Sequence, residues 1–388
     1  MRIAVVTGRY GPGVIGGAES LARGFAHAIS QRGWDVEVWT TCARSHYTWE
    51  NELPSGSEHD AAVMIRRFPI TGWDAGRFGM LDRRLQTTGR LSLDEEFEWL
   101  ATAPHSVALY HHIREASQEF DVVLCLPYAS PVIQSGAWMV KGASLLLWPC
   151  LHNEPYAYME IVRHLLERAE GVMFLSPEEQ DLAIGRLGLQ LQHSGVVGGG
   201  MDVAGAVETL SHASGERGAH VVYAGRLEDG KNLGLLYTCM QQCHRLYPDV
   251  QLRVIGSGPL KPPNGPGFEY LGFVSEEQKA ELLSSALALC QPSLNESFSI
   301  TIMESWLSDT PVLVHSDCPV TRGHVLRSRG GLHFRDCQEF TAAVEWFVEN
   351  PWRAGRMAAN GRRYVTSNYS WDAVISRFRS LLGRWRLC

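Results

Sequence analysis

Short apolar runs alternate along this chain with stretches in which apolar residues recur at helical spacing. A β-branched run at 3–7 is followed by a glycine-rich loop, a stretch of helical period at 19–31 and another short run at 35–40. Buried strands are short and β-branched, whereas an amphipathic helix repeats its apolar positions every 3.6 residues. The pattern therefore predicts a strand, a helix and a strand.

The same plan begins again in the second half of the chain. Residues 219–225 and 250–256 read as strands, and 233–247 reads as the helix that joins them. Before this repeat, glycine, alanine and serine replace the large apolar residues over 195–220, which is typical of a linker between domains. The pattern thus predicts that a parallel sheet starts twice along the chain.

Further apolar runs continue both halves. We expect strands at 121–126, 144–149, 268–271, 286–290 and 311–315, and helices at 154–167, 276–285, 338–349 and 351–368. A last helix is expected from Trp371, with Ser370 as its N-cap. Alternating strands and helices in two blocks predict two doubly wound α/β domains, whose ligands bind at the carboxyl ends of strands, in a cleft.

Composition narrows the class of protein. The 388 residues are 45% hydrophobic and carry a net charge of -7, so a large core can form and broad nucleic-acid binding is disfavoured. The apolar run at the N-terminus is too short for a signal peptide or a membrane span. We therefore expect a cytoplasmic protein that binds no nucleic acid.

Nine cysteines are scattered along the chain without a CxxC pair. This spacing indicates neither a disulfide framework nor a zinc site, and most cysteines are expected to be small buried residues. Cys239, Cys243 and His244 share one helical stretch and could ligate a metal, but no fourth ligand follows at a matching spacing. We therefore expect no metal site.

The glycines of residues 11–16, GPGVIG, match the spacing of a dinucleotide-binding loop. The strand before them ends too early, however, and the acidic candidate Glu37 lies within the second strand. The sequence instead favours Gly16 and Gly17 as positions where a ligand approaches the backbone at a helix N-terminus. Glycines that serve only a tight turn are the alternative.

Two cations follow the first strand of the second half. Arg226 comes directly after it, and Lys231 precedes the next helix. Cations at the carboxyl end of a strand, beside a helix N-terminus, suit a phosphate group. The alternative is a solvated loop in which Arg226 pairs with Glu228 or Asp229.

Two glutamates stand eight positions apart in NESFSITIMES, residues 295–305. Glu296 is expected in a loop that ends at a helix starting at Ser297 or Ser299, and Glu304 about two turns into that helix. The two carboxylates could contact one extended ligand at separate points. The alternative, a surface helix with Glu304 solvated, is disfavoured by the apolar residues around Glu304.

Together these segments resemble the retaining glycosyltransferases of family four, which have the GT-B fold of two Rossmann-like domains facing a central cleft. The resemblance spans nearly the whole chain and lies in GGAE (16–19), VVGGGMD (196–202), GRLEDGKN (225–232), VIGSGP (254–259), FEYLGFVSEEQ (268–278) and PSLNESFSITIMESW (292–306), which holds the family's E-x7-E signature. It implies an acceptor domain at 1–200, a donor domain at 201–370 and a helix at 371–388 that returns to the first domain.

The resemblance also implies a donor, a UDP- or GDP-sugar, and no other cofactor. Arg226 and Lys231 would hold the diphosphate, Glu296 the donor-sugar hydroxyls and Glu304 the ribose. Further donor contacts would come from the backbone of Ser297, Phe298 and Ser299, from Gly256, from the base-binding loop with Phe273 and Val274, and from Gly16 and Gly17. His152, just after a strand, matches a histidine that contacts the donor sugar in relatives.

For this family we expect hexosyl transfer with retention, without a metal, because no DxD motif is present. The catalytic residues would be Glu296, His152, Arg226 and Lys231, with Glu296 orienting the sugar while a donor phosphate oxygen helps to deprotonate the acceptor. Ser299 stands where many relatives have glycine, so it would crowd the donor or bond to it.

The acceptor is not indicated: a glycan, a lipid-linked or a small-molecule hydroxyl would each fit. The arginine-rich segment 43–104 has little regular period and is expected to form an acceptor-side lid, a peripheral contact with the inner face of the membrane, or a solvated loop. The alternative functions are a nucleotide-sugar epimerase-like enzyme, a silent binding protein of this fold, and an NAD-dependent oxidoreductase.

Overall fold

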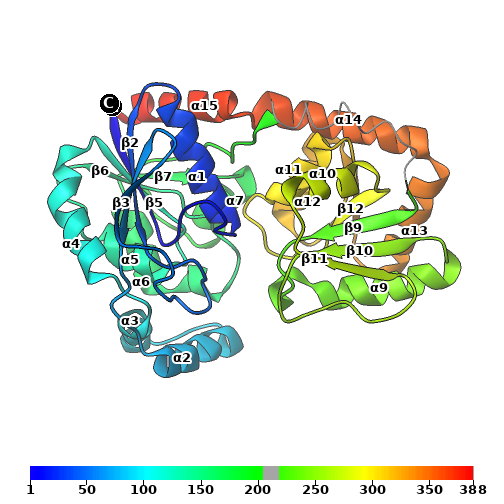
Figure 1. The fold of residues 1–388 in the computed structure, drawn as a ribbon, viewed down its shortest axis with the longest axis horizontal. Coiled ribbons are helices and arrows are strands. Elements are labelled where there is room, and N and C mark those ends of the chain that lie inside the picture. The colour runs from blue at the N-terminus through cyan, green and yellow to red at the C-terminus, as the bar shows by residue number, and fades with distance from the viewer. Residues whose placement is uncertain (204–217, 388) are drawn as a thin grey trace. The chain divides into compact units, whose positions relative to one another are not determined.

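The computed structural model describes residues 1–203 and 218–387, and contacts divide it into two compact units (Figure 1). The first unit comprises Met1–Gly200 and the helix that starts at Trp371, and the second lies within Met201–Ser370. Part of the expected linker, residues 204–217, lies outside the described residues. Each unit has its own sheet and its own apolar core.

The sheet of the first unit has eight strands in the order β3-β4-β2-β1-β5-β6-β7-β8. All neighbouring strands are parallel except β3 and β4. The strands are β1 (Arg2–Thr7), β2 (Asp35–Thr41), β3 (Gly56–Asp60), β4 (Val63–Phe68), β5 (Val122–Leu126), β6 (Ser144–Leu147), β7 (Gly171–Phe174) and β8 (Ser194–Val196). The central strands β1 and β5 are almost wholly buried, as expected for a sheet covered on both faces.

Eight α-helices among the described residues belong to this unit. They are α1 (Gly17–Ser30), α2 (Ala75–Thr88), α3 (Leu93–Thr102), α4 (Val107–Ala116), α5 (Pro131–Ala137), α6 (Glu160–Arg168), α7 (Pro177–Asp181) and α15 (Trp371–Trp385). A short 3-10 turn at Pro155–Tyr158 precedes α6, where the sequence predicted one continuous helix.

Helix α15 packs on α1, although the two helices lie near opposite ends of the chain. A salt bridge between Arg32, just after α1, and Asp372 of α15 joins positions that are 340 apart. The Phe378 ring meets the Phe25 ring edge-on, with 5.1 Å between centroids. A Cβ atom on Gly200 would lie 2.1 Å from the Trp371 side chain, so only glycine fits there. The C-terminal helix therefore completes the core of the first unit.

Segment 43–104 is more regular than the sequence indicated. It contains β3, β4, α2 and α3, which the irregular period did not predict, so the alternative of a merely solvated loop is wrong. On β4, burial alternates, and Arg67 takes an inward position where an apolar residue would be expected. Its guanidinium donates to the carbonyl of Tyr10 at 2.8 Å and to Glu58 at 2.7 Å, and these bonds make the buried charge tolerable.

The sheet of the second unit has six parallel strands in the order β11-β10-β9-β12-β13-β14. The strands are β9 (His220–Ala224), β10 (Gln251–Ile255), β11 (Phe268–Gly272), β12 (Ala288–Gln291), β13 (Val312–His315) and β14 (Gly331–Phe334). Numbered within the unit, this order is 3-2-1-4-5-6, the Rossmann arrangement. The two doubly wound domains that the sequence predicted are confirmed.

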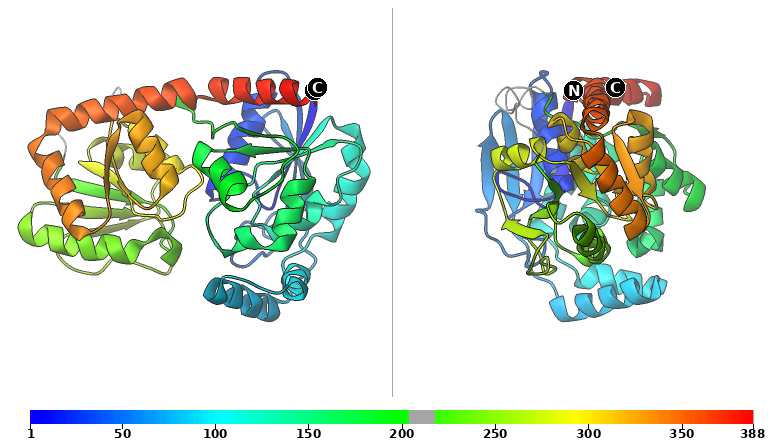
Figure 2. Two further views of the ribbon diagram at one scale, coloured as in Figure 1. Left: turned by 180° about the vertical axis from the view of Figure 1, so that it is seen from behind. Right: turned by 90° about the vertical axis from the view of Figure 1, so that its right-hand side faces the viewer.

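Helices lie on both faces of this second sheet (Figure 2). They are α9 (Leu233–Leu246), α10 (Glu276–Ser284), α11 (Ile300–Leu307), α12 (Pro319–Ser328), α13 (Cys337–Glu349) and α14 (Pro351–Asn368). Most of these elements start and end within two residues of their predicted bounds. No helix of the described part of the chain combines the length and apolar character that a membrane span requires.

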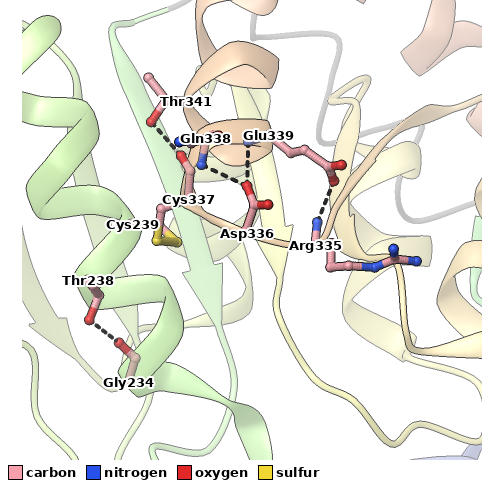
Figure 3. Close-up of a disulfide and its surroundings, with 9 residues drawn as sticks. All are labelled: Gly234, Thr238, Cys239, Arg335, Asp336, Cys337, Gln338, Glu339 and Thr341. Carbon is pink, nitrogen blue, oxygen red and sulfur yellow. Dashed lines mark hydrogen bonds between the residues drawn. A yellow bond between two sulfur atoms is a disulfide. The ribbon is translucent and has the colours of Figure 1, made fainter.

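Two cysteines of this unit are paired, which corrects the expectation that no disulfide forms. Cys239 on α9 is bonded to Cys337 at the start of α13 (Figure 3). The suggested metal site on α9 fails for the same reason, and His244 instead contacts the carbonyl of Val250 through Nδ1 at 3.0 Å. Within residues 1–203 and 218–387, no cluster of three or more His, Cys, Asp or Glu could hold a metal ion.

Candidate functional site

The switch point of the second sheet lies between β9 and β12, where the strand order reverses. Chain connections leave the carboxyl ends of these two neighbours in opposite directions, which opens a crevice that binds ligands in open α/β sheets. The loop after β9 carries Arg226 and Lys231, and the loop after β12 carries Glu296. The topology therefore brings the three side chains to one edge of the sheet.

Lys231 and Glu296 are in direct contact. Lys231 Nζ lies 2.6 Å from Glu296 Oε1, and the side chains are only 18% and 10% exposed. Next to them, Asn232 adopts a left-handed conformation (φ 55°), starts α9 and donates from Nδ2 to the carbonyl of Pro292 at 3.1 Å. The two loops are thus tied together twice, and the sequence alone gave Asn232 no role.

Arg226 is more exposed than Lys231. Its side chain is 47% accessible, and Nη1 lies 3.1 Å from a carboxylate oxygen of Glu228, the local pair that the sequence left open as an alternative. The carbonyl of Arg226 accepts a hydrogen bond from the buried Tyr223 hydroxyl at 2.7 Å. The backbone of Arg226 is therefore fixed, while its guanidinium faces solvent at the edge of the sheet.

Gly256 has a structural role in this region. Its φ is 132°, and a Cβ atom there would lie 1.9 Å from the carbonyl oxygen of Gly225. Its amide donates to the carbonyl of Gly272 at 2.8 Å. The loops after β9, β10 and β11 are therefore packed backbone to backbone, and the contact of Gly256 with a donor stays a prediction.

The base-binding loop that the sequence suggested follows β11. Phe273 is 67% exposed, an unusual state for a phenylalanine, and Val274 is half-buried. Ser275 then starts α10 with a capping box. An exposed aromatic ring next to a helix start is available for contact with a planar group.

Residues Ser297, Phe298 and Ser299 are buried and lead into α11. The helix begins at Ile300, later than the earliest start that the sequence allowed, because Ser299 has the left-handed conformation (φ 68°, ψ 82°). The Phe298 ring packs edge-on against Tyr369 and His324, with centroid distances of 5.0 and 5.4 Å. An N-terminus of this kind favours negative groups, since its first amides lack partners within the helix.

Glu304 lies on the same helix and pairs with a residue that the sequence did not indicate. Lys279 Nζ on α10 lies 2.9 Å from Glu304 Oε1, whereas Oε2 is buried and has no hydrogen-bond partner in the described chain. Burial raises the pKa of this carboxyl group. The solvated alternative for Glu304 is therefore wrong, and Lys279 was missed because its contact joins positions 25 apart.

In the first unit, Gly16 and Gly17 stand at the start of α1. Gly17 is the first helical residue and is exposed. Gly16 has a φ of 158°, and a Cβ atom there would lie 1.9 Å from Glu19, which pairs with Arg9 at 2.5 Å. Gly16 therefore makes room for this buried pair, and Gly17 remains the glycine open to a ligand.

His152 also lies in the first unit, in the loop after β6. Its Nδ1 is 3.5 Å from Glu154, and Glu154 accepts a hydrogen bond from the Tyr128 hydroxyl at 2.8 Å. The buried Glu179 accepts hydrogen bonds from the amides of Leu151 and Leu175, each at 2.5 Å, and thereby holds this loop. Burial raises the pKa of Glu179 to about 8. Glu179 was not among the residues predicted from the sequence.

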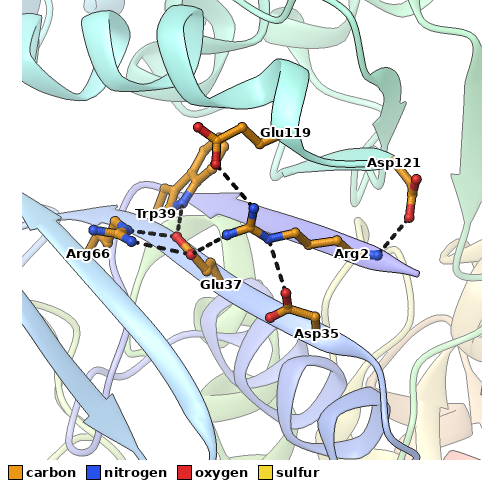
Figure 4. Close-up of polar contacts among 7 residues, drawn as sticks. All are labelled: Arg2, Asp35, Glu37, Trp39, Arg66, Glu119 and Asp121. Atoms are coloured by element: carbon orange, nitrogen blue, oxygen red, sulfur yellow. Dashed lines mark hydrogen bonds and ion pairs between the residues drawn. The ribbon is translucent and has the colours of Figure 1, made fainter.

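The acidic residue that a dinucleotide-binding reading would need is already engaged. Glu37 lies inside β2 and pairs with Arg66 at 2.7 Å and with Arg2 at 3.1 Å, while Trp39 donates to it at 3.1 Å (Figure 4). Burial opposes its ionisation, but the hydrogen bonds from Arg66 and Trp39 keep the pKa below its usual value. Glu37 therefore links side chains within the sheet. It does not lie at the end of a strand, where the acidic residue of a dinucleotide site would bind a ribose.

Comparison with known proteins gives a family match in the second unit. Residues 210–364 match the family model described as glycosyl transferases group 1. Over 97% of this chain and 93% of that protein, the chain is 23% identical to the glycogen synthase of Mycobacterium tuberculosis (strain CDC 1551 / Oshkosh). This similarity extends beyond the matched family segment.

Solved structures match the whole fold. Sucrose-phosphate synthase from Thermosynechococcus elongatus superimposes with a TM-score of 0.71 at 18% identity and covers 99% of this chain and 98% of that one. HepE from Anabaena, in complex with UDP and glucose, superimposes with a TM-score of 0.70 at 15% identity, with 99% of both chains covered. The predicted GT-B fold class is thereby confirmed.

Proposed function

We propose that this chain, a GT-B glycosyltransferase by fold and by the sequence family of its second unit, transfers a hexose from a UDP- or GDP-sugar to an acceptor hydroxyl. The observation that carries the proposal is the contact between Lys231 and Glu296, with Arg226 on the same loop, at the switch point of the second sheet. HepE in complex with UDP and glucose has the same fold, which supports a nucleotide-sugar donor.

The cations of the β9 loop would bind the diphosphate of the donor. Lys231 has three N–H donors, so it can keep its contact with Glu296 and still donate to a phosphate oxygen. Arg226 would reach the same group from the exposed edge. Each charge-assisted hydrogen bond contributes about 1.5–3 kcal/mol, whereas enzymes lower barriers by about 8–23 kcal/mol. The N-termini of α1 and α11 and enforced proximity must therefore contribute as well.

The carboxylates would bind the neutral parts of the donor. Glu296, held by Lys231, would accept hydrogen bonds from the sugar hydroxyls, and Glu304 would accept hydrogen bonds from the ribose. Phe273 and Val274 would flank the base. Ionised carboxylates accept hydrogen bonds from hydroxyl groups, and apolar side chains such as Phe273 and Val274 pack against a planar base.

The remaining roles belong to the first unit and to the turn before α11. Gly17 would let a phosphate approach the N-terminus of α1, and His152 would contact the donor sugar. The backbone amides of Ser297, Phe298 and Ser299 would face phosphate and sugar oxygens. Each of these groups lies at the carboxyl end of a strand or at a helix start, where ligands of α/β domains bind.

The reaction would proceed with retention and without a metal. The bond between the anomeric carbon and the phosphate oxygen breaks, and the nucleoside diphosphate leaves with the electron pair. The acceptor oxygen bonds to the same face of that carbon, and its proton passes to a donor phosphate oxygen. Glu296 orients the sugar and does not attack it.

Nucleotide binding tests the proposed donor site. UDP or GDP should raise the Tm of the wild type in a thermal-shift assay, because a ligand that binds only the native state stabilises it. Arg226→Ala should bind UDP or GDP, and Glu296→Ala the corresponding nucleotide sugar, about ten- to a hundredfold more weakly, since each loses a charge-assisted contact with that ligand. Arg353→Ala and Glu349→Ala, exposed residues of α14 and α13, are the matched controls and should behave as wild type.

Two outcomes would count against the proposal. Equal shifts in wild type and in both site variants would place the nucleotide elsewhere. Once a donor and an acceptor have been found by product screening, NMR of the isolated product gives its anomeric configuration. Inversion relative to the donor would exclude the retaining mechanism.

A further inference from the structure

A buried amide joins the two ends of the loop that carries Glu296. Gln291, the last residue of β12, is 5% exposed, and its Nε2 donates to Ser299 Oγ and to Thr301 Oγ1, both at 3.3 Å. At the other end of the loop, Ser293 donates to Gln291 Oε1 at 3.1 Å. One side chain therefore contacts the first turn of the loop and the start of α11.

These four polar side chains form a closed set. Ser293 and Ser299 are 0% and 6% exposed, and the hydroxyl oxygens of Ser299 and Thr301 are 3.4 Å apart. Buried polar groups are costly unless they are hydrogen-bonded, and a fully bonded network gives a segment one well-defined conformation. Such a network at this place fixes the path of residues 292–300.

Ser299 needs a conformational support of this kind. With φ 68° and ψ 82° it has a left-handed backbone, which glycine adopts freely and other residues adopt rarely. Its side chain makes no capping bond to a backbone amide of α11, and its hydroxyl approaches that helix at 3.4 Å from the Thr301 hydroxyl. Its hydroxyl also accepts a hydrogen bond from Gln291, whose amide binds Thr301 as well. The amide of Gln291 is thus the group placed to stabilise the turn.

We propose that Gln291 is a positioning residue for the donor site: it holds Ser299 in the left-handed conformation and so fixes the loop that presents Glu296 and the amides before α11. The donor part of this inference rests on the proposed function, whereas the clamp itself does not. It also assigns the Ser299 hydroxyl to the protein interior. Ser299 then neither crowds the donor nor bonds to it through its side chain.

Gln291→Met tests the clamp, because methionine has a similar shape and no hydrogen-bonding amide. Amide hydrogen exchange of the peptide covering 292–300, measured without ligand, should become about tenfold faster. Ser299→Gly alone should exchange as wild type. In Ser299→Gly, the further change Gln291→Met should have a much smaller effect, because glycine needs no support at this φ. Gln242→Met, exposed on α9, is the matched control.

Ligand binding supplies the second measurement. Affinity for UDP and GDP, measured by calorimetry, should fall about tenfold in Gln291→Met and recover in the double variant. A purely structural role for Gln291 would not predict rescue by Ser299→Gly. Unchanged hydrogen exchange in Gln291→Met would overturn the inference. So would a loss of nucleotide affinity on Gln291→Met that is as large in the Ser299→Gly variant as in the wild type. If wild type binds neither nucleotide, the proposed function fails, and the exchange data alone decide on the clamp.

Discussion

At the scale of single residues, the candidate site depends on carboxylates that are paired before any ligand arrives. Glu296 has Lys231 as its partner, and Glu304 has Lys279. A cation held at 2.6–2.9 Å offsets the cost of taking a carboxylate out of water. Paired in this way, both acids can remain ionised although they are largely buried.

The Lys279–Glu304 pair makes a testable prediction about stability. Lys279→Met should lower the free energy of unfolding of the second unit by about 1–3 kcal/mol, because it leaves the half-buried Glu304 without its cation. Urea denaturation followed by hydrogen exchange of peptides from α10 and α11 measures this loss. Glu276→Gln, which removes the exposed partner of the same lysine, should change stability by no more than about 0.5 kcal/mol. Equal effects of both variants would contradict the prediction.

At the scale of elements, the disulfide links two helices that the sequence presents as independent. Cys239 and Cys337 are 98 positions apart and join α9, which starts two residues after Lys231, to the first turn of α13. Asp336 caps that turn through the amides of Gln338 and Glu339, both at 2.9 Å (Figure 3). The N-terminal half of α9 is therefore held both by the core and by a covalent bond.

Reduction should destabilise the second unit. Opening a disulfide that closes a long loop typically costs about 2–4 kcal/mol, since the unfolded chain gains freedom. Urea unfolding with and without reductant measures the difference. The double variant Cys239→Ala, Cys337→Ala is the matched control, because reductant should not change its stability. Alkylation of every cysteine in the unreduced, denatured protein would show that the bond is absent.

At the scale of the whole molecule, the first unit is assembled from both ends of the chain. Helix α15 lays Phe378, Leu381 and Trp385 into its core, and Gly171 and Gly195 leave room for the last two side chains. The second unit, by contrast, is contained within one continuous stretch. The C-terminal helix is thus a structural part of the first unit.

Phe378→Ala should therefore destabilise the first unit selectively. Truncating a large, fully buried ring typically costs about 3–5 kcal/mol. Hydrogen exchange should become faster in peptides of α1 and β1, while peptides of β9 and β12 keep their protection. Arg384→Ala, an exposed position of the same helix, should leave both sets unchanged. Faster exchange in both units with Phe378→Ala would mean that they unfold together.

Much of the fold follows from local pattern. Both sheet starts, the helices α1 and α9 and the final helix from Trp371 were predicted within two residues, since their periods are regular and their ends are marked by caps or glycines. Segment 43–104 was not, because its strand β4 buries Arg67 where the pattern requires an apolar residue. Long-range bonds to Tyr10 and Glu58 make that exception possible.

The candidate site, like the fold, was predicted in part from the sequence. By itself, the sequence determined which loops follow the strands of each sheet, and hence that Arg226, Lys231 and Glu296 meet at one edge. Only the tertiary structure decided that Lys231 bonds to Glu296, Lys279 to Glu304, and Gln291 to Ser299 and Thr301. The physical reason is that period and composition record local conformation, whereas a buried charge or amide finds its partner only when distant segments pack together.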